Sequence, residues 1–371
     1  MVTFLELECR GSAHEKINLG FILKALGFSE RIRFIAHESH IETIKNQLQE
    51  IEKQKIDFIS IDLPEKHYKI SSVFYYYNTF KSLKNIINES EKLIFLSFFS
   101  WSLIGFNLFL KLNQVKIKSV FFICHGVQEN IFSLRKFNRY KKFLKPNNLH
   151  VFFTQIAYNL FKSKKFYFVF LSRHIESNFI RLFSNSIKIN FLTINIPYKF
   201  DYFDLKKVSE NINFGTVGKG DLDSTYKLLS RHPEINFKVI SAINSKILNK
   251  FTNCKFFYQN ERLDRNQIDR EIKEIDYLIF FYSKESYTLS ISGALIDAIN
   301  YLKPIIFLKN ECISYYNNKY NIGFEYENLD ELIRNINSKK LIDNYSSFQL
   351  NLLKLKKEFQ KNDFNLLWNQ T

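Results

Sequence analysis

The sequence predicts an α/β protein with two successive domains, each built on a parallel β-sheet. Short apolar segments alternate along the whole chain with longer segments of helical periodicity, the pattern of strand–helix–strand units. A length of 371 residues suits two domains of ordinary size. Hydrophobic residues make up 46% and Gly and Pro are few, so disordered and fibrous classes are excluded.

The first domain is expected to span residues 1–195. Helical periodicity fills most of the gaps between its strands, for example over Glu15–Leu26 and Glu38–Glu52. A less patterned stretch, Ile196–Phe203, is expected to cross to the second domain. Six segments are short and apolar with many aromatic or β-branched residues, as buried strands are. They lie near Val2–Cys9, Arg31–His37, Ile56–Ile61, Leu93–Phe98, Lys118–Cys124 and Phe166–Ser172.

One segment of the first domain allows two interpretations. Leu93 to Leu110 runs for eighteen residues without a charge, the length at which a membrane span is suspected. Several serines and an asparagine interrupt it. A buried strand at Leu93–Phe98 followed by a buried helix at Ser102–Leu110 explains the segment equally well and fits the neighbouring alternation.

The second domain is expected to span residues 205–345. It begins with a strand at Asn211–Val217, a glycine-containing loop and a helix to about Arg231. From Ser338 the pattern is amphipathic and helical. Residues 346–371, with Trp368 as an anchor, are expected to form a terminal helix that packs back on the first domain. The further strands are predicted near Phe237–Ile240, Cys254–Phe257, Tyr277–Phe281, Pro304–Leu308 and Gly323–Tyr326.

Cysteine usage and the N-terminus predict a cytoplasmic location. The four cysteines have no paired spacing, so neither a disulfide framework nor a zinc site is expected. The first ten residues carry acidic side chains where a signal peptide would carry positive charge.

No bound metal is expected. Metal-dependent transferases need an Asp-X-Asp after a strand, and Asp221-Leu222-Asp223 begins a helix instead.

The chain is strongly basic, with a formal net charge of +16 and a pI of about 9.4. Such an excess attracts nucleic acid, an anionic membrane surface or nucleotide-linked substrates. The densest basic run is Leu134–Lys145, in which aromatic residues recur every third position among six cations. That pattern is typical of a helix in a membrane interface, although a solvated basic face over a core-facing stripe explains it too.

Residues 276–304 outline a nucleotide-diphosphate site. A short buried strand is followed by a polar loop and then by Ser292-Gly293, which opens a helical pattern that stops before Pro304. Exposed N–H groups and the positive end of the helix dipole favour an anion at that point. Gly293 permits close approach of a phosphate, and Ser292 can cap the helix. Asp297, about one turn further on, can accept hydrogen bonds from a ribose.

This segment resembles the donor site of glycosyltransferases with the GT-B fold. In that family an acidic residue seven positions before a proline holds the ribose, as Asp297 stands before Pro304, and small residues at the helix start hold the diphosphate. The resemblance implies two Rossmann-like domains with a C-terminal crossover helix. Gly218-Lys219 after the strand at Asn211–Val217 resembles the family's Gly-Arg/Lys, whose cation neutralises the donor diphosphate.

The resemblance also implies catalytic histidines in the first domain. His14, in the loop after the first strand, matches the base that deprotonates the acceptor hydroxyl in inverting members. His125, directly after the strand at Lys118–Cys124, matches the histidine that binds the donor sugar or its leaving phosphate in retaining members. An imidazole suits proton transfer near neutral pH.

One departure from the family pattern leaves the stereochemistry open. Retaining members carry a glutamate eight residues before the ribose-binding acid, where this chain has Leu289. Glu285, four residues earlier in the loop, is the candidate replacement, and Tyr287 is another loop group available to the donor.

The sequence therefore predicts a bacterial, metal-independent GT-B glycosyltransferase that needs no cofactor. Its expected partners are a nucleotide-sugar donor, a lipid-linked glycan acceptor and the anionic inner face of the cytoplasmic membrane, in synthesis of a surface polysaccharide such as O-antigen or capsule. Nucleic acid is not an expected partner. A nucleotide-sugar epimerase of the same fold, a basic nucleic-acid-binding protein and an inactive GT-B scaffold stay open as alternatives.

Overall fold

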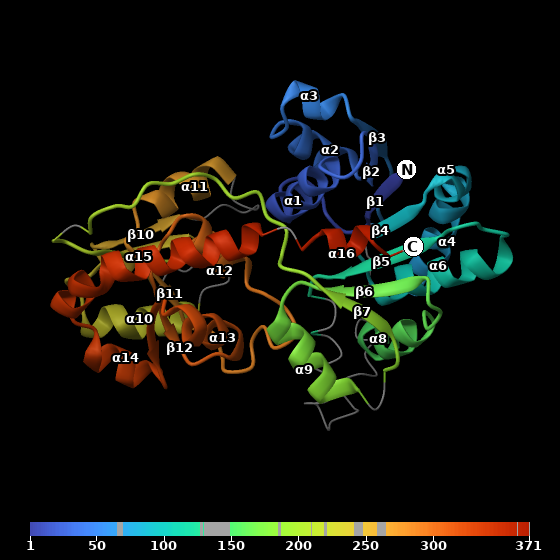
Figure 1. The fold of residues 1–371 in the computed structure, drawn as a ribbon. Helices are drawn as coiled ribbons and strands as arrows, with labels where there is room; N and C mark the ends of the chain where they lie inside the picture. The colour runs from blue at the N-terminus through green and yellow to red at the C-terminus, as the bar shows by residue number, and fades with distance from the viewer. Residues whose placement is uncertain are drawn as a thin grey trace. The chain divides into compact units, whose positions relative to one another are not determined.

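The computed structural model describes residues 1–64, 70–126, 129, 149–184, 187–208, 210–218, 221–240, 248–257, 265–361 and 363–370 (Figure 1). The chain forms two compact units: Met1–Lys199 together with Lys361–Thr371, and Phe200–Gln360. Each unit contains one parallel sheet with helices on both faces (Figure 1). The predicted α/β class with two Rossmann-like domains is confirmed.

The first unit contains a seven-stranded sheet in which every neighbouring pair is parallel. The order is β3-β2-β1-β4-β5-β6-β7, so the chain moves outward from β1 on one side and restarts with β4 on the other. The carboxyl ends of β1 and β4 flank a topological switch point, where open α/β sheets bind ligands. The strands are β1 (Val2–Glu6), β2 (Ile32–Ala36), β3 (Ile56–Ser60), β4 (Lys92–Ser97), β5 (Ser119–Cys124), β6 (Phe166–Phe170) and β7 (Asn190–Thr193).

Aromatic side chains fill the core of this unit. The ring of Phe95 on β4 lies 4.9 Å from that of Phe106 and 5.0 Å from that of Phe122, centroid to centroid. The helices around the sheet are α1 (Glu15–Leu26), α2 (Glu38–Lys45), α3 (Glu50–Lys53), α4 (Ser72–Ser82), α5 (Lys84–Glu89), α6 (Ser100–Leu112), α8 (Leu149–Asn159), α9 (Arg173–Phe183) and α16 (Asn365–Trp368).

The uncharged segment Leu93–Leu110 forms the strand β4 and the helix α6, as the second interpretation proposed. Among the helices that the structure describes, not one has the length and apolar character required to cross a bilayer. The basic run Leu134–Lys145 lies outside the described residues.

The second unit contains a six-stranded parallel sheet of order β10-β9-β8-β11-β12-β13. Its switch point lies between β8 and β11. The strands are β8 (Asn213–Val217), β9 (Asn236–Ile240), β10 (Cys254–Phe257), β11 (Tyr277–Phe280), β12 (Ile305–Leu308) and β13 (Gly323–Tyr326). The helices are α10 (Leu222–Arg231), α11 (Arg265–Lys273), α12 (Gly293–Asn300), α13 (Glu311–Tyr320), α14 (Leu329–Asn335) and α15 (Ser338–Gln360).

The C-terminal part differs from the expected helix over 346–371. α15 runs without a break from Ser338 to Gln360 and belongs to the second unit, because Leu341, Tyr345 and Phe348 pack into that unit's core. Only the residues from Lys361 onward belong to the first unit.

The returning segment is held in the first unit by polar and aromatic contacts. The Asp363 carboxylate accepts a hydrogen bond from the N–H of Asn195 at 2.6 Å. The Trp368 ring lies 5.1 Å from that of Phe28, and Phe364 lies 5.8 Å from Phe21. Trp368 is therefore an anchor, as expected, but on a short helix rather than on a long one.

Candidate functional site

Two glycines expose backbone at the switch point of the second sheet. Gly218 directly follows β8 and has φ +87°, a conformation that favours glycine. Gly293 is the first residue of α12, which follows β11 and its loop. A Cβ added at either glycine would meet no described atom within 4 Å. A phosphate can therefore approach the main chain closely at both positions. Lys219, the predicted cation of this site, lies outside the described residues.

Ser292 caps α12. Its Oγ accepts a hydrogen bond from the N–H of Leu295 at 3.3 Å and lies 2.9 Å from the hydroxyl of Tyr282. The side chain is fully buried. Burial, with the neighbouring Tyr287, raises the pKa of Tyr282 well above its ordinary value, so this phenol is neutral. Ser292 thus acts as the cap of α12, and the N–H groups at the start of α12 are the donors that an anion would meet there.

The loop between β11 and α12 is held by side-chain contacts. Asn310 donates from Nδ2 to the carbonyl oxygens of Ser283 and Ser286, both at 2.8 Å. Tyr287 adopts a left-handed backbone with φ 62°, and its ring lies 4.8 Å from that of Tyr282. A non-glycine residue in this region is uncommon and is often found at functional sites.

The position of the retaining members' glutamate and its candidate replacement differ sharply in exposure. Leu289, at the family's glutamate position, is fully buried. Glu285 is exposed on the loop, where its carbonyl oxygen accepts from Thr288 Oγ1 at 2.9 Å. A carboxylate that reaches a donor sugar from this loop therefore has to come from Glu285.

Asp297, the predicted ribose ligand, forms a bidentate ion pair that sequence reasoning missed. Arg265, the first residue of α11, places Nη2 at 2.6 Å from Oδ1 and Nη1 at 3.3 Å from Oδ2 of Asp297. The Nε of Arg265 lies 2.6 Å from Oδ1 of Asp269, one turn further along α11. One guanidinium therefore joins two carboxylates at the edge of the site.

The two predicted catalytic histidines meet in the first unit. His14 follows β1 and His125 follows β5, and their rings lie 4.3 Å apart, edge to face. His14 is exposed at the N-cap of α1 with φ 53°, and its Nδ1 lies 3.6 Å from the sulfur of Cys9. Burial lowers the pKa of His125 to about 4, so this imidazole is neutral at physiological pH.

A buried polar network supports the loop that carries His14. Asn18 donates from Nδ2 to the carboxylate of Glu6 at 2.8 Å and to Nε2 of His40 at 3.0 Å. Nδ1 of His40 lies 2.6 Å from the carbonyl oxygen of Gly11 and must carry the proton, because a carbonyl only accepts. The Glu6 carboxylate also accepts from the N–H of Cys9 at 3.1 Å and from the hydroxyl of Ser97.

Within the ranges given above, no group of three or more His, Cys, Asp or Glu side chains is arranged to hold a metal ion. The expected helix start at Asp221 is confirmed, since its carboxylate caps α10 through the N–H groups of Asp223 and Ser224.

No protein-family model and no curated protein sequence matches the chain. Solved structures of low sequence identity do match over nearly its whole length. HepE of Anabaena, in complex with UDP and glucose, is 13% identical with a TM-score of 0.64, over 100% of this chain and 98% of that one.

Two further matches come from other organisms. Sucrose-phosphate synthase of Thermosynechococcus elongatus is 9% identical with a TM-score of 0.61, over 97% and 94% of the two chains. A glycosyltransferase of Rickettsia africae is 14% identical with a TM-score of 0.54, over 98% and 99%. Together with the two sheet orders, these likenesses show that the chain has the GT-B fold.

Proposed function

We propose that this protein is a glycosyltransferase that moves a sugar from a nucleotide-diphosphate donor to a glycan acceptor. The observation that carries the proposal is the set of groups at the switch point of the second sheet. Gly218, the start of α12 at Gly293, and Asp297 one turn along α12 occupy the edge where nucleotides bind in doubly wound sheets. The solved HepE structures hold UDP, UDP with glucose, or UDP-glucose, and this supports a uridine nucleotide as the first donor to test.

The diphosphate would be stabilised by main-chain donors. When the bond between the sugar and the diphosphate breaks, negative charge grows on the leaving phosphate. The N–H groups at the start of α12 and its dipole are fixed in advance, so they can stabilise that charge without reorganising. We assign the second positive charge to Lys219, after Gly218, and propose that transfer needs no metal ion.

The acceptor would be activated in the first unit. The exposed imidazole of His14 is the candidate base for the acceptor hydroxyl. With Nδ1 directed at the Cys9 sulfur, Nε2 is the nitrogen for proton transfer. To His125, neutral and in ring contact with His14, we assign the role of orienting that imidazole and of contacting the donor sugar.

We further propose a lipid-linked acceptor in synthesis of a bacterial surface polysaccharide, with the enzyme on the cytoplasmic face of an anionic membrane. The net charge of +16 and the aromatic-basic run Leu134–Lys145 support this part. Sedimentation with vesicles of phosphatidylglycerol and phosphatidylethanolamine tests it. Binding that is lost in vesicles without the anionic lipid is expected, and equal pelleting with both kinds of vesicle would contradict it.

Nucleotide binding and sugar release test the central proposal. Calorimetry with UDP, GDP, CMP and TDP should show one preferred nucleotide, and its sugar conjugate should be turned over with release of that nucleotide. Asp297→Asn should weaken binding by about tenfold or more, the effect of losing hydrogen bonds to a charged group. Asp343→Asn, an exposed residue on α15, is the matched control.

Each alternative has its own signature in these experiments. Absence of binding to every nucleotide, with salt-sensitive binding to RNA, would refute the proposal and favour a nucleic-acid-binding protein. Conversion of the donor sugar into its epimer without transfer would identify an epimerase. Tight nucleotide binding without any turnover would indicate an inactive scaffold.

A further inference from the structure

The pairing of Arg265 with Asp297 has a consequence for nucleotide recognition. Asp297 is 7% exposed, and the two nitrogens of the guanidinium fork contact its two oxygens separately. Such a pair fixes the plane of the carboxylate as well as its position.

A carboxylate can accept about four hydrogen bonds, and a bidentate arginine uses two of them. The two hydroxyls of a ribose are vicinal and cis, so they present two donors at nearly the spacing of two carboxylate oxygens. A carboxylate that is held in one plane can accept from both hydroxyls without losing further side-chain entropy.

The arginine is itself held by its helix. Asp269, on the same face of α11, pairs with Nε of Arg265. Tyr301, at the end of α12, lies beside this cluster, and its pKa is raised chiefly by burial, with the charge of Arg265 opposing the rise.

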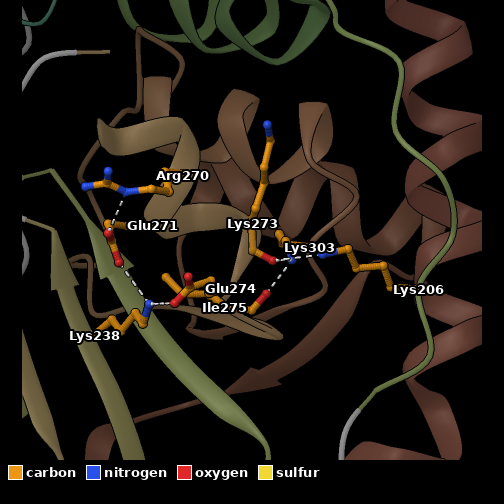
Figure 2. Close-up of polar contacts among 8 residues, drawn as sticks. All are labelled: Lys206, Lys238, Arg270, Glu271, Lys273, Glu274, Ile275 and Lys303. Carbon is orange, nitrogen blue, oxygen red and sulfur yellow. Dashed lines mark hydrogen bonds and ion pairs between the residues drawn. The ribbon is translucent and has the colours of Figure 1, made fainter. Parts of the chain in front are cut away.

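The other end of α11 is anchored to the sheet by lysines (Figure 2). Lys238 on β9 pairs with Glu271 at 2.9 Å and also with Glu274. Lys303, before β12, donates to the carbonyl oxygens of Lys273 at 2.9 Å and Ile275 at 2.5 Å. α11 is therefore fixed by a side chain from β9 and by one from the segment that precedes β12, and Arg265 at its start has a defined position.

We propose that Arg265 is a positioning residue for nucleotide binding, which presents the Asp297 carboxylate to the vicinal diol of the donor's ribose. The inference rests on the proposed function, since it takes the ligand to be a ribonucleotide. Recognition of the ribose would then depend on two helices, with the carboxylate on α12 and the arginine that orients it on α11.

Calorimetry with UDP and with 2′,3′-dideoxyUDP, and with GDP and its dideoxy analogue in parallel, tests this role. The wild type should prefer the ribonucleotide by about tenfold or more. Arg265→Gln should weaken binding of the ribonucleotide by about tenfold and leave binding of the dideoxy analogue within about twofold. Arg265→Lys should keep part of the preference for the ribonucleotide, since its ammonium retains the positive charge but cannot form the bidentate pair of a guanidinium.

Arg270→Gln is the matched control, because Arg270 lies on the same helix with 68% of its side chain exposed. This variant should bind both nucleotides as the wild type does. If Arg265→Gln does not fold, Asp269→Asn should show a smaller loss of the same selective kind.

Three results would overturn the inference and leave the proposed function intact. Arg265→Gln could weaken ribonucleotide and dideoxynucleotide alike, could bind the ribonucleotide as tightly as the wild type, or could bind it more tightly. The last result would make the arginine a competitor of the ribose. A wild type that binds no ribonucleotide would instead refute the proposed function, and this inference with it.

Discussion

Lys303 carries a buried ammonium, and its burial predicts in which direction the stability of the protein changes with pH. The residue is 2% exposed, and its Nζ donates to two backbone carbonyl oxygens, those of Lys273 at the end of α11 and of Ile275 before β11 (Figure 2). Burial, with repulsion from Lys206, lowers its pKa from the ordinary 10.5 to about 8, while Asp276 opposes the shift. Between these two values the unfolded chain holds a proton that the folded chain has released.

The free energy of unfolding must therefore rise with pH in this window. Stability from this group is complete above pH 10.5 and is lost as the pH falls through about 8. At 1.36 kcal/mol for each pH unit, the difference between the two pKa values corresponds to about 3 kcal/mol. Lys303→Met removes the titrating group, so the stability advantage of the wild type over this variant should grow by about 3 kcal/mol from pH 7.5 to pH 10.5.

Urea unfolding of both proteins across this pH range measures the effect. Tyrosines that titrate in both proteins contribute equally to the two free energies of unfolding, so their contribution cancels in the difference. At neutral pH the variant should be of similar stability to the wild type. It loses two hydrogen bonds from a charged donor, at about 1.5–3 kcal/mol each, but also the desolvation cost of a buried charge. Lys354→Met, exposed on α15, controls for the loss of one positive charge. A wild-type advantage that does not change with pH would refute the reasoning.

Three further predictions concern the site and the second sheet. Gly293→Ala should keep or slightly raise the melting temperature, since its Cβ enters open space on a helix, yet weaken nucleotide binding measured by calorimetry; tighter binding would contradict the close approach of a phosphate. Gly323→Ala should lower the melting temperature strongly, because its Cβ would lie 1.9 Å from the carbonyl oxygen of Ile305. His14→Asn, with a residue that tolerates the left-handed backbone, should reduce sugar transfer by about a hundredfold or more and leave nucleotide affinity unchanged; full activity would exclude His14 as the base.

Most strands could be predicted because each is a short buried apolar segment in a parallel sheet. β7 was missed because its four residues are all only partly buried, so the edge strand lacks the strong apolar signal. The end of α15 was misplaced for a different reason. The amphipathic pattern that packs Tyr345 into the second unit gives no sign that the chain changes units at Lys361.

The arrangement of the candidate site could be predicted only where its residues are close together in the sequence. Ser292, Gly293 and Asp297 belong to one helix start, and the sequence shows them together. The contact between Arg265 and Asp297 joins residues 32 positions apart on two helices, and it depends on how α11 and α12 pack on the sheet. The meeting of His14 and His125 likewise depends on the order β1-β4-β5, which brings loops that are distant in the chain to one edge.

The return of the last ten or so residues to the first unit imposes an order on biosynthesis. As the ribosome releases the chain, the second unit has all of its residues once Gln360 has emerged, but the first unit still lacks the segment with Asp363 and Trp368. Until then Phe21 and Phe28 lack the aromatic partners that cover them. The part synthesised first is thus the last to be completed, and a fragment that stops at Lys199 would expose this apolar surface to aggregation.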